Sequence, residues 1–321
     1  MTRKKSTPSA QMTGRLLMVG FGSIGQACLP VLMDALRLPA DRIRIVKPSP
    51  DASGVAQKLG VEVIVQRVDE GNHRAVLEPL LAPGDFLVNL AVDVSSLALI
   101  RLCRQCGALY LDTCNEPWPG RYDDPEVPPS RRSNYSLREE VLAYRLDKRH
   151  GPTAVITQGA NPGLVSALVK QAMLDIAQAS EAMPRHMPTS FEDWAALARS
   201  LDIRAIHIAE RDTQVARARK ARGEFVNTWS VDGFIDEGLQ PAELGWGSDE
   251  RHWAAGAPPP GHGSDAAIYL DRPGVATRVR SWTPLEGPYI GFLVTHAESI
   301  SIADHLTLRE EGKVVYRPTV H

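Results

Sequence analysis

The sequence predicts an α/β fold in which a doubly wound parallel sheet is followed by a second domain of α+β type. Three observations support this prediction. A short apolar run leads into a glycine-rich turn within residues 15–25. Strand-like and helical patterns then alternate as far as about residue 178, which is typical of parallel sheets with crossover helices. Beyond that point, β-branched stretches are separated by loops rich in glycine and proline.

The glycine-rich turn has the pattern G-x-G-x-x-G between a predicted strand at residues 15–19 and a predicted helix at 23–36. Gly20 permits the tight turn, Gly22 allows a pyrophosphate to approach the backbone, and Gly25 lets the helix pack close to its strand. Amide groups at the start of the helix would hold the phosphates. A glycine-rich turn of any α/β protein is the alternative. The predicted Rossmann-type cofactor turn comprises Gly20, Gly22, Ser23, Ile24 and Gly25.

Strands and helices of the first domain are expected in regular alternation. Strands are predicted at residues 15–19, 42–46, 61–65, 85–92, 108–112 and 153–160. Helices are predicted at 23–36, 55–59, 73–81, 134–149, 163–176 and in a segment that ends at Cys106, where Ser95 or Ser96 can act as the N-cap. We expect a disordered arm at residues 1–14, a nucleotide-binding domain at 15–178 and a second domain at 179–321.

The second domain is predicted to contain a sheet, antiparallel or mixed. Its candidate strands are residues 203–209, 225–231, 266–270, 277–282, 291–295 and 313–316. Helical patterns become sparse after Ser200.

Composition and charge exclude several classes of protein. The chain has 321 residues, a formal net charge of −2, 43% hydrophobic residues and 23% charged residues. These values are ordinary for a globular protein of about two domains, and they give no overall attraction to nucleic acid or anionic membranes. Apolar runs are shorter than the ~20 residues that span a bilayer. Four cysteines are too few for a disulfide scaffold, which favours the cytoplasm.

Polar residues follow the predicted strands of the first domain, and ligands of doubly wound sheets bind beyond the carboxyl ends of strands. The stretches at these ends are residues 89–93, 112–116 and 159–162. Asp93 follows a strongly apolar strand, where an acid needs a functional or structural reason. Beyond the glycine turn, the cofactor-binding residues that we expect are Asn89, Asp93, Thr113, Ala160 and Asn161.

Two of these stretches also have plain structural interpretations. Asn161 precedes Pro162, so it is not easily helical and would project at the rim of the sheet; simple capping of the next helix is an equal alternative. Thr113 and Glu116 could contact a cofactor or substrate, and the other interpretation is a polar turn.

Lys47 departs from the dinucleotide-binding pattern, because an acid usually closes the second strand and binds the ribose hydroxyls. The nearest acid here is Asp51. A lysine could accept a 2′-phosphate or point into solvent, so the residues favour NAD over NADP only slightly.

Acids and aromatic residues are interleaved in the second domain. Trp229 is followed by Asp232, Asp236 and Glu237. Carboxylates beside an aromatic face suit a cationic ligand. The alternative is a set of solvated charges and separate core tryptophans.

The pair His296 and Glu298 would lie on one face of a strand, by the period of two. Cys103 and Cys106 form a C-x-x-C pair on a predicted helix without a second pair or a suitable pair of histidines. We therefore predict no metal site.

Long motifs over residues 16–321 resemble those of the bacterial homospermidine synthases, which belong to the wider saccharopine-dehydrogenase-like group. These motifs are GFGSIG, NLAVDVSS, YLDTCNEPW, GANPGLVS, IHIAERDTQ, FVNTWSV, EGLQPAELGWG, TRVRSW and GFLVTHAESISIADHLT. The resemblance implies that the second domain serves substrate binding and dimerisation. It also implies an enzyme that holds NAD, oxidises putrescine to an imine, adds a second putrescine with loss of ammonia, and returns the hydride to give homospermidine. Spermidine can similarly act as the donor.

The resemblance also implies roles for particular residues. Trp229 matches a residue that stacks on a substrate ammonium, and His296 matches a residue at the reacting end that could shuttle protons near neutral pH. Glu210, Glu237 and Glu298 match acids that position amine groups. Asn161 and Asp93 match residues between nicotinamide and substrate. The expected site residues are therefore catalytic His296, Glu298, Glu237, Glu210, Asn161 and Asp93, with Trp229 and Glu116 binding substrate.

The remaining expectations concern the protein as a whole. The family resemblance implies a homodimer acting on small polyamines, and the cysteine content favours the cytoplasm. The resemblance also implies a chain that continues beyond His321, so we expect low stability or weak activity of these residues alone. Two other functions remain open: a reductive-amination dehydrogenase of the saccharopine or carboxynorspermidine type, for which Arg211 and Arg280 are available, and an inactive nucleotide-binding protein.

Overall fold

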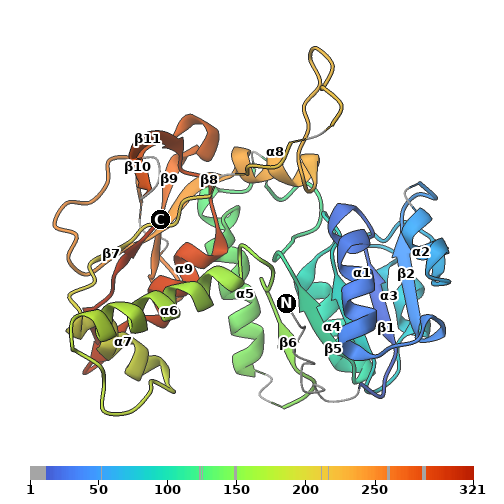
Figure 1. Ribbon diagram of the computed structural model, residues 1–321, viewed down its shortest axis with the longest axis horizontal. Coiled ribbons are helices and arrows are strands. Elements are labelled where there is room, and N and C mark those ends of the chain that lie inside the picture. The colour runs from blue at the N-terminus through green and yellow to red at the C-terminus, as the bar shows by residue number, and fades with distance from the viewer. Residues whose placement is uncertain are drawn as a thin grey trace. The chain divides into compact units, whose positions relative to one another are not determined.

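The chain forms two compact units in a computed structural model that describes residues 12–51, 53–122, 124, 126–147, 150–210, 212–215, 217–258, 261–283 and 287–321 (Figure 1). Unit 1 consists of the described residues of Met1–Pro119, Arg145–Thr157 and Gly223–Asp232. Unit 2 consists of those of Gly120–Tyr144, Gln158–Arg222 and Gly233–His321.

Unit 1 contains a six-stranded parallel sheet among its described residues. Its strands are β1 (Leu16–Val19), β2 (Ile43–Lys47), β3 (Glu62–Val65), β4 (Phe86–Asn89), β5 (Leu109–Asp112) and β6 (Ala154–Val155). The order is β3-β2-β1-β4-β5-β6 with parallel pairing throughout. This is the strand order of a doubly wound dinucleotide-binding sheet. The predicted α/β fold class is therefore confirmed.

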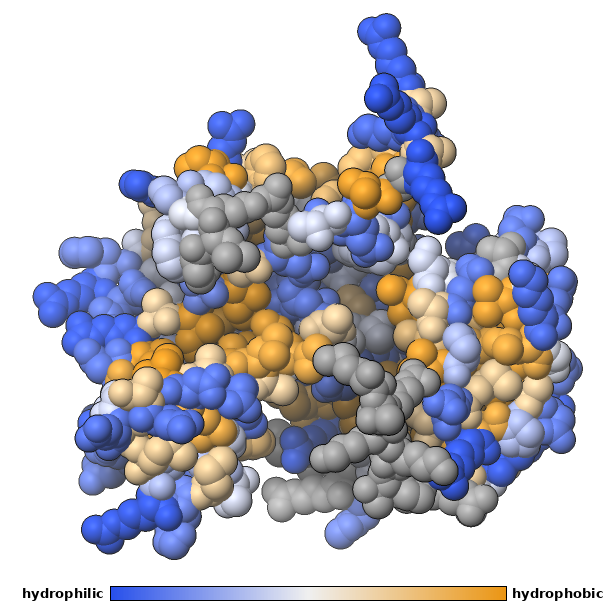
Figure 2. All heavy atoms as spheres, viewed as in Figure 1, coloured by the Kyte–Doolittle hydropathy of each residue, from blue (hydrophilic) through white to orange (hydrophobic). Residues whose placement is uncertain are grey.

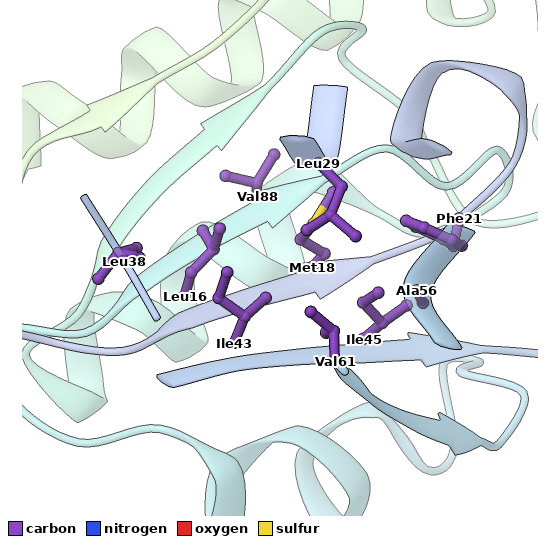
Figure 3. Close-up of a cluster of buried hydrophobic side chains, with 10 residues drawn as sticks. All are labelled: Leu16, Met18, Phe21, Leu29, Leu38, Ile43, Ile45, Ala56, Val61 and Val88. Atoms are coloured by element: carbon purple, nitrogen blue, oxygen red, sulfur yellow. The ribbon is translucent and has the colours of Figure 1, made fainter. Parts of the chain in front are cut away.

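One face of this sheet is covered by helices α1 (Ser23–Leu36) and α2 (Gly54–Lys58). Leu29 of α1 is fully buried against Leu16 and Met18 of β1 and Ile45 of β2 (Figure 3). Because side chains alternate along a strand, Leu16 and Met18 point to this same face. Burying a leucine of this kind stabilises the fold by about 1.5–3 kcal/mol.

Helix α4 (Ser96–Cys106) begins where the sequence predicts. The Ser95 hydroxyl accepts a hydrogen bond from the Ala98 amide at 3.3 Å, so Ser95 rather than Ser96 is the N-cap. Unit 1 also contains α3 (His73–Leu77), which is followed by a 3-10 turn at Glu78–Leu80; another 3-10 turn at Ala40–Arg42 precedes β2.

Unit 2 combines helices with a mixed sheet of four strands among the described residues, in the order β7-β14-β8-β9. Strand β14 is parallel to β7 and antiparallel to β8, and β8 is antiparallel to β9. The sheet strands are β7 (Ala205–Ile206), β8 (Pro241–Gly245), β9 (Ala267–Pro273) and β14 (Thr319–Val320). Two hairpins pair β10 (Arg278–Thr283) with β11 (Gly287–Phe292) and β12 (Leu308–Glu310) with β13 (Lys313–Tyr316); a 3-10 turn at Gly274–Ala276 precedes β10.

The helices of unit 2 are most of α5 (Asn134–Asp147), α6 (Leu164–Ala179), α7 (Phe191–Ser200), most of α8 (Val231–Leu239), and α9 (Ala297–His305). A 3-10 turn at Pro129–Arg131 precedes α5. Met173 and Ala177 of α6 pack with Leu197 of α7 and Ile302 of α9. Helix α6 thus joins unit 2, although residues up to 178 were assigned to the first domain from sequence. The contacts place this helix differently because its buried face matches α7 and α9.

Helix α9 lies very close to strand β8. An added Cβ on Gly245 would stand 2.4 Å from the Ser299 carbonyl oxygen and 2.5 Å from the Ala303 Cβ. Only glycine permits this approach.

Several local predictions are wrong. Residues 225–230 form no strand, and α8 begins at Val231. Phe225 and Val226 are both more than half exposed, unlike side chains buried in a sheet. Strand β11 ends at Phe292, so the strand predicted at 291–295 is also wrong. His296 and Glu298 do not share a strand, because His296 is the N-cap of α9. Strands β4 and β6 are shorter than predicted.

Within the described residues, the helices are all too short or too polar to cross a bilayer.

Candidate functional site

The β1–α1 turn of unit 1 is shaped to leave room for a ligand. Gly20 has φ +87° and donates its amide to Val46 O at 2.9 Å. Gly22 precedes α1 without a side-chain cap, and a Cβ built on it meets no atom within 4 Å. Ser23 and Ile24 are exposed at the same turn. The first amides of α1 thus face open space, as a pyrophosphate requires.

The ends of β1 and β4 lie together at the carboxyl edge of the sheet. Val19 is opposite Asn89, and the Leu90 amide donates to Val19 O at 2.7 Å. Asn89 is buried, donates through Nδ2 to Val94 O at 3.2 Å and accepts the Ala91 amide at 3.2 Å. These bonds hold the loop that carries Asp93, whose φ is +66°. Asn89 and the Asp93 loop therefore lie beside the glycine turn.

The loop after β5 is fastened to the start of α4. The Glu116 amide donates to Ser96 Oγ at 3.0 Å, and the Ser96 amide donates to Glu116 O at 2.8 Å. Register places Asn89 opposite Asp112, so Thr113 and Glu116 follow the neighbouring strand at the same edge. Their roles toward cofactor or substrate stay predictions.

Asp112, the first residue of the polar stretch 112–116, is fully buried. It accepts the Tyr110 hydroxyl at 2.8 Å and the Thr157 amide at 2.6 Å. Burial raises the pKa of this carboxyl to about 7, against the lowering effect of these hydrogen bonds. An acid at the end of an apolar strand was the available signal.

Asn161 and Glu210 are brought together in unit 2. Asn161 Nδ2 donates to Glu210 Oε2 at 2.7 Å, while its Oδ1 is buried and has no hydrogen-bond partner among the described residues. The backbone around it is a tight turn, in which the Gly159 amide donates to Pro162 O at 2.7 Å. The turn also contains Ala160. A buried carbonyl oxygen without a donor is suited to a ligand N–H or O–H group.

His296, Glu237 and Glu298 form a second cluster in unit 2. His296 Nδ1 lies 3.1 Å from Glu298 Oε1, and its Nε2 is ion-paired with Glu237 of α8. The side chains are 22%, 3% and 17% exposed for His296, Glu298 and Glu237. Two carboxylates around one imidazolium leave one negative charge in excess, which favours a cation.

The proton of His296 is held firmly. Burial alone would lower its pKa, but hydrogen bonds to Glu237 and Glu298, together with the charges of these carboxylates, outweigh burial and raise the pKa to about 10. The imidazole is therefore protonated near neutral pH. The expectation that it titrates in the neutral range was wrong for this arrangement, because the sequence did not reveal the contact with Glu237.

Trp229 belongs to the segment Gly223–Asp232 of unit 1 and is 36% exposed. The cluster of Glu237, His296 and Glu298 belongs to unit 2. The role of Trp229 in substrate binding stays a prediction.

The segment between Glu210 and Trp229 is polar. Its exposed residues include Arg217, Arg219, Lys220 and Arg222. The segment forms the yellow loop at the top of Figure 1, and Figure 2, in the same view, shows this loop as strongly hydrophilic.

The strand order and the open glycine turn define unit 1 as a Rossmann-class dinucleotide-binding unit. Residues 16–155 match the family model "Saccharopine dehydrogenase NADP binding domain", and residues 159–321 match "Saccharopine dehydrogenase C-terminal domain". The chain belongs to the saccharopine dehydrogenase family.

Two relatives with substantial sequence identity have a more specific name than that of the family. The chain is 51% identical over 315 residues to a homospermidine synthase of Blastochloris viridis and 45% identical over 316 residues to one of Mesorhizobium japonicum. In each case the match covers 97% of this chain, which spans 66% and 65% of the length of these relatives.

A solved structure is similar throughout the chain. The homospermidine synthase of Legionella pneumophila in complex with NAD is 44% identical, with a TM-score of 0.86 over 98% of this chain and 66% of that one.

Proposed function

We propose that the chain acts as a homospermidine synthase. It would transfer an aminobutyl group from putrescine, or from spermidine, to putrescine through an imine, with loss of ammonia when putrescine is the donor, while NAD is reduced and then reoxidised in one cycle. The observation that carries this proposal is the cluster of Glu237, His296 and Glu298, a partly enclosed site with excess negative charge. Identity of 45–51% to homospermidine synthases supports it.

The residues present fit NAD. Gly20, Gly22 and Gly25 would seat the pyrophosphate against the start of α1, where a Cβ on Gly22 would stand in open space. Asn89 and the Asp93 loop lie beside this turn. The similar structure that contains NAD supports the choice of cofactor.

The chain's own charges suit a protonated diamine. Glu237 and Glu298 attract the ammonium group, and in a partly buried site this attraction is stronger than in bulk water. Loss of hydride beside an amine leaves positive charge on an iminium, which the same carboxylates stabilise. We assign Trp229 to stacking on the substrate cation and Asn161 with Glu210 to holding an amine between carbonyl oxygen and carboxylate. We also assign a catalytic role to Asp93 and a role in substrate binding to Glu116, as the family resemblance implies.

In this arrangement the imidazole of His296 keeps its proton near neutral pH. A substrate ammonium that pairs with Glu237 would replace the imidazolium as the neighbouring cation. His296 could then release its proton and act as a base toward the amine.

Incubation of the protein with putrescine and NAD at one hundredth of the putrescine concentration tests the proposal. Mass spectrometry should detect homospermidine in molar excess over NAD. Net accumulation of NADH would instead indicate a dehydrogenase, and NAD binding without product would indicate a nucleotide-binding protein.

Trp229→Ala tests the proposed stacking. Loss of a cation–π contact of about 1–2 kcal/mol should raise the KM for putrescine roughly 5- to 30-fold, with NAD affinity unchanged. Trp253→Ala is the matched control, since Trp253 is exposed and its ring packs edge-on against Trp246. Equal effects of the two substitutions would contradict the assignment of Trp229.

We further propose a homodimer in the cytoplasm. Light scattering on the purified protein tests the dimer, and a mass of one chain at micromolar concentration would contradict it.

A further inference from the structure

Glu243 of β8 is a buried carboxylate at the meeting point of three elements of unit 2. It is 1% exposed. Its Oε2 accepts the Asn134 amide at 2.8 Å, and its Oε1 accepts the Tyr135 amide at 3.1 Å, both at the start of α5. Its Oε2 also accepts the Thr295 hydroxyl at 2.5 Å.

Thr295 is held from two sides. Its hydroxyl donates to Glu243 and accepts a hydrogen bond from Asn134 Nδ2 at 3.2 Å. Thr295 is itself 1% exposed. Both hydroxyl functions are thus committed, which fixes the side chain and the backbone that carries it.

The next residue along the chain is His296, whose ring reaches Glu298 and Glu237. The segment that follows β11 is fixed by a hydrogen bond of its first residue, in which the Leu293 amide donates to Thr277 O at 2.9 Å. Thr295 is therefore the side-chain anchor immediately before the imidazole.

Capping of α5 alone would not need a buried acid. A serine or threonine hydroxyl can cap a helix, whereas a buried carboxylate without a cation is costly. Within the described part of the chain, Glu243 takes part in no ion pair, and burial raises its pKa to about 7. The carboxylate has enough acceptor positions to receive the two amides and the hydroxyl at once, which a single hydroxyl cannot do.

We propose that Glu243 is a positioning residue for His296, which it orients toward Glu237 and Glu298 by fixing Thr295 against the start of α5. The consequence for turnover rests on the proposed function; the effect on the imidazole does not.

The test compares Thr295→Val, which removes the hydroxyl and keeps the shape, with Thr295→Ser, which keeps the hydroxyl. Histidine labelled with carbon-13 at Cε1 gives the imidazole titration by NMR, and the His296 signal is assigned by its loss in His296→Gln. We expect Thr295→Val to lower the pKa of His296 by at least one unit and Thr295→Ser to leave it within 0.3 units, as order-of-magnitude shifts for a displaced charged partner.

Glu243→Gln should lower the same pKa, and Glu139→Gln is its matched control. Glu139 is also a largely buried acid of unit 2, which pairs with Arg138 and accepts from Ser264, but it does not contact Thr295. If Glu243→Gln does not fold, the Thr295 pair decides the matter alone.

Measurement of enzyme activity provides an independent test of the positioning role. In the homospermidine assay, Thr295→Val should lower kcat about tenfold or more, with the KM for NAD unchanged and activity rescued in Thr295→Ser. An unchanged His296 pKa in folded Thr295→Val overturns the positioning role, even if the wild-type protein makes homospermidine. A shifted pKa in a protein that makes none supports positioning and rejects only the proposed function.

Discussion

The Nδ1 atom of His296 lies 3.1 Å from Glu298 Oε1, although only one residue separates them in the chain. The contact arises because His296 is the N-cap of α9 and Glu298 lies in the first turn of that helix. Glu237 approaches the other ring nitrogen from α8. Three residues from two helices therefore make one charged unit.

The stability contributed by this unit should fall in alkaline solution. The pKa of His296 is raised in the folded protein to about 10, above its ordinary value of 6.5. The contribution is therefore complete below pH 6.5 and is lost as the pH rises through 10. Urea unfolding of the wild type should show a loss of roughly 2–4 kcal/mol between pH 7 and 10 that is absent in His296→Gln. Equal losses in the two proteins would show that His296 is not the group responsible.

Binding of putrescine should release protons. A diamine ammonium that takes the place of the imidazolium beside Glu237 would let the pKa of His296 return toward 6.5. At pH 8 we expect release of up to about one proton per site. Isothermal titration calorimetry in phosphate and in Tris measures this, because the two buffers differ in ionisation enthalpy. Identical enthalpies in both buffers would contradict displacement of the imidazolium.

The stability contributed by Asp112 should depend on pH in the acidic to neutral range. Its folded pKa is raised from 3.8 to about 7 by burial. Its contribution is complete below pH 3.8 and is lost as the pH rises through 7. Between pH 5 and 8 the wild type should therefore lose about 2 kcal/mol more unfolding free energy than Asp112→Asn. Asp51→Asn, at an exposed position, should behave as the wild type does.

Gly20 and Gly22 should respond differently to alanine. At Gly20 the positive φ and a Cβ only 2.6 Å from the Ala91 amide nitrogen should destabilise the fold by about 1–3 kcal/mol or more. Gly22→Ala has free space and should change unfolding free energy by less than about 0.5 kcal/mol. It should nevertheless weaken NAD binding about tenfold or more by filling the place of the pyrophosphate. Unchanged NAD affinity in Gly22→Ala would contradict the proposed cofactor position.

Lys47 should have little influence on the choice between NAD and NADP. Its side chain is buried, and its ammonium group donates to the carbonyl oxygen of Asp51. It therefore serves the β2–α2 loop rather than pointing into solvent. Replacement by Met should change the ratio of the two dissociation constants by less than about threefold, as measured by nucleotide fluorescence. A loss of NADP affinity alone would show that the ammonium contacts a 2′-phosphate.

Elements governed by local chemistry were predictable from the sequence. Helix α1 has the predicted bounds Ser23–Leu36, because a glycine turn precedes it and its apolar residues recur at helical spacing. Strand β13 has the predicted bounds 313–316.

Elements governed by distant contacts were not predictable. Residues 296–298 were expected in a strand, yet helix α9 begins at Ala297, and its residues Ile300 and Ala303 are buried within unit 2. The partners of Glu243 at the start of α5 are more than one hundred residues away. No period in the sequence reveals such a contact.

The close approach at Gly245 has a consequence for the charged cluster. Helix α9 carries His296 at its cap and Glu298 in its first turn, and it can rest on β8 only because residue 245 has a hydrogen atom where other residues have carbon. A single methyl group there would push the helix outward and carry both ionic groups with it. The distance between the sheet and the proposed amine-binding charges is thus set by the smallest side chain available to a protein.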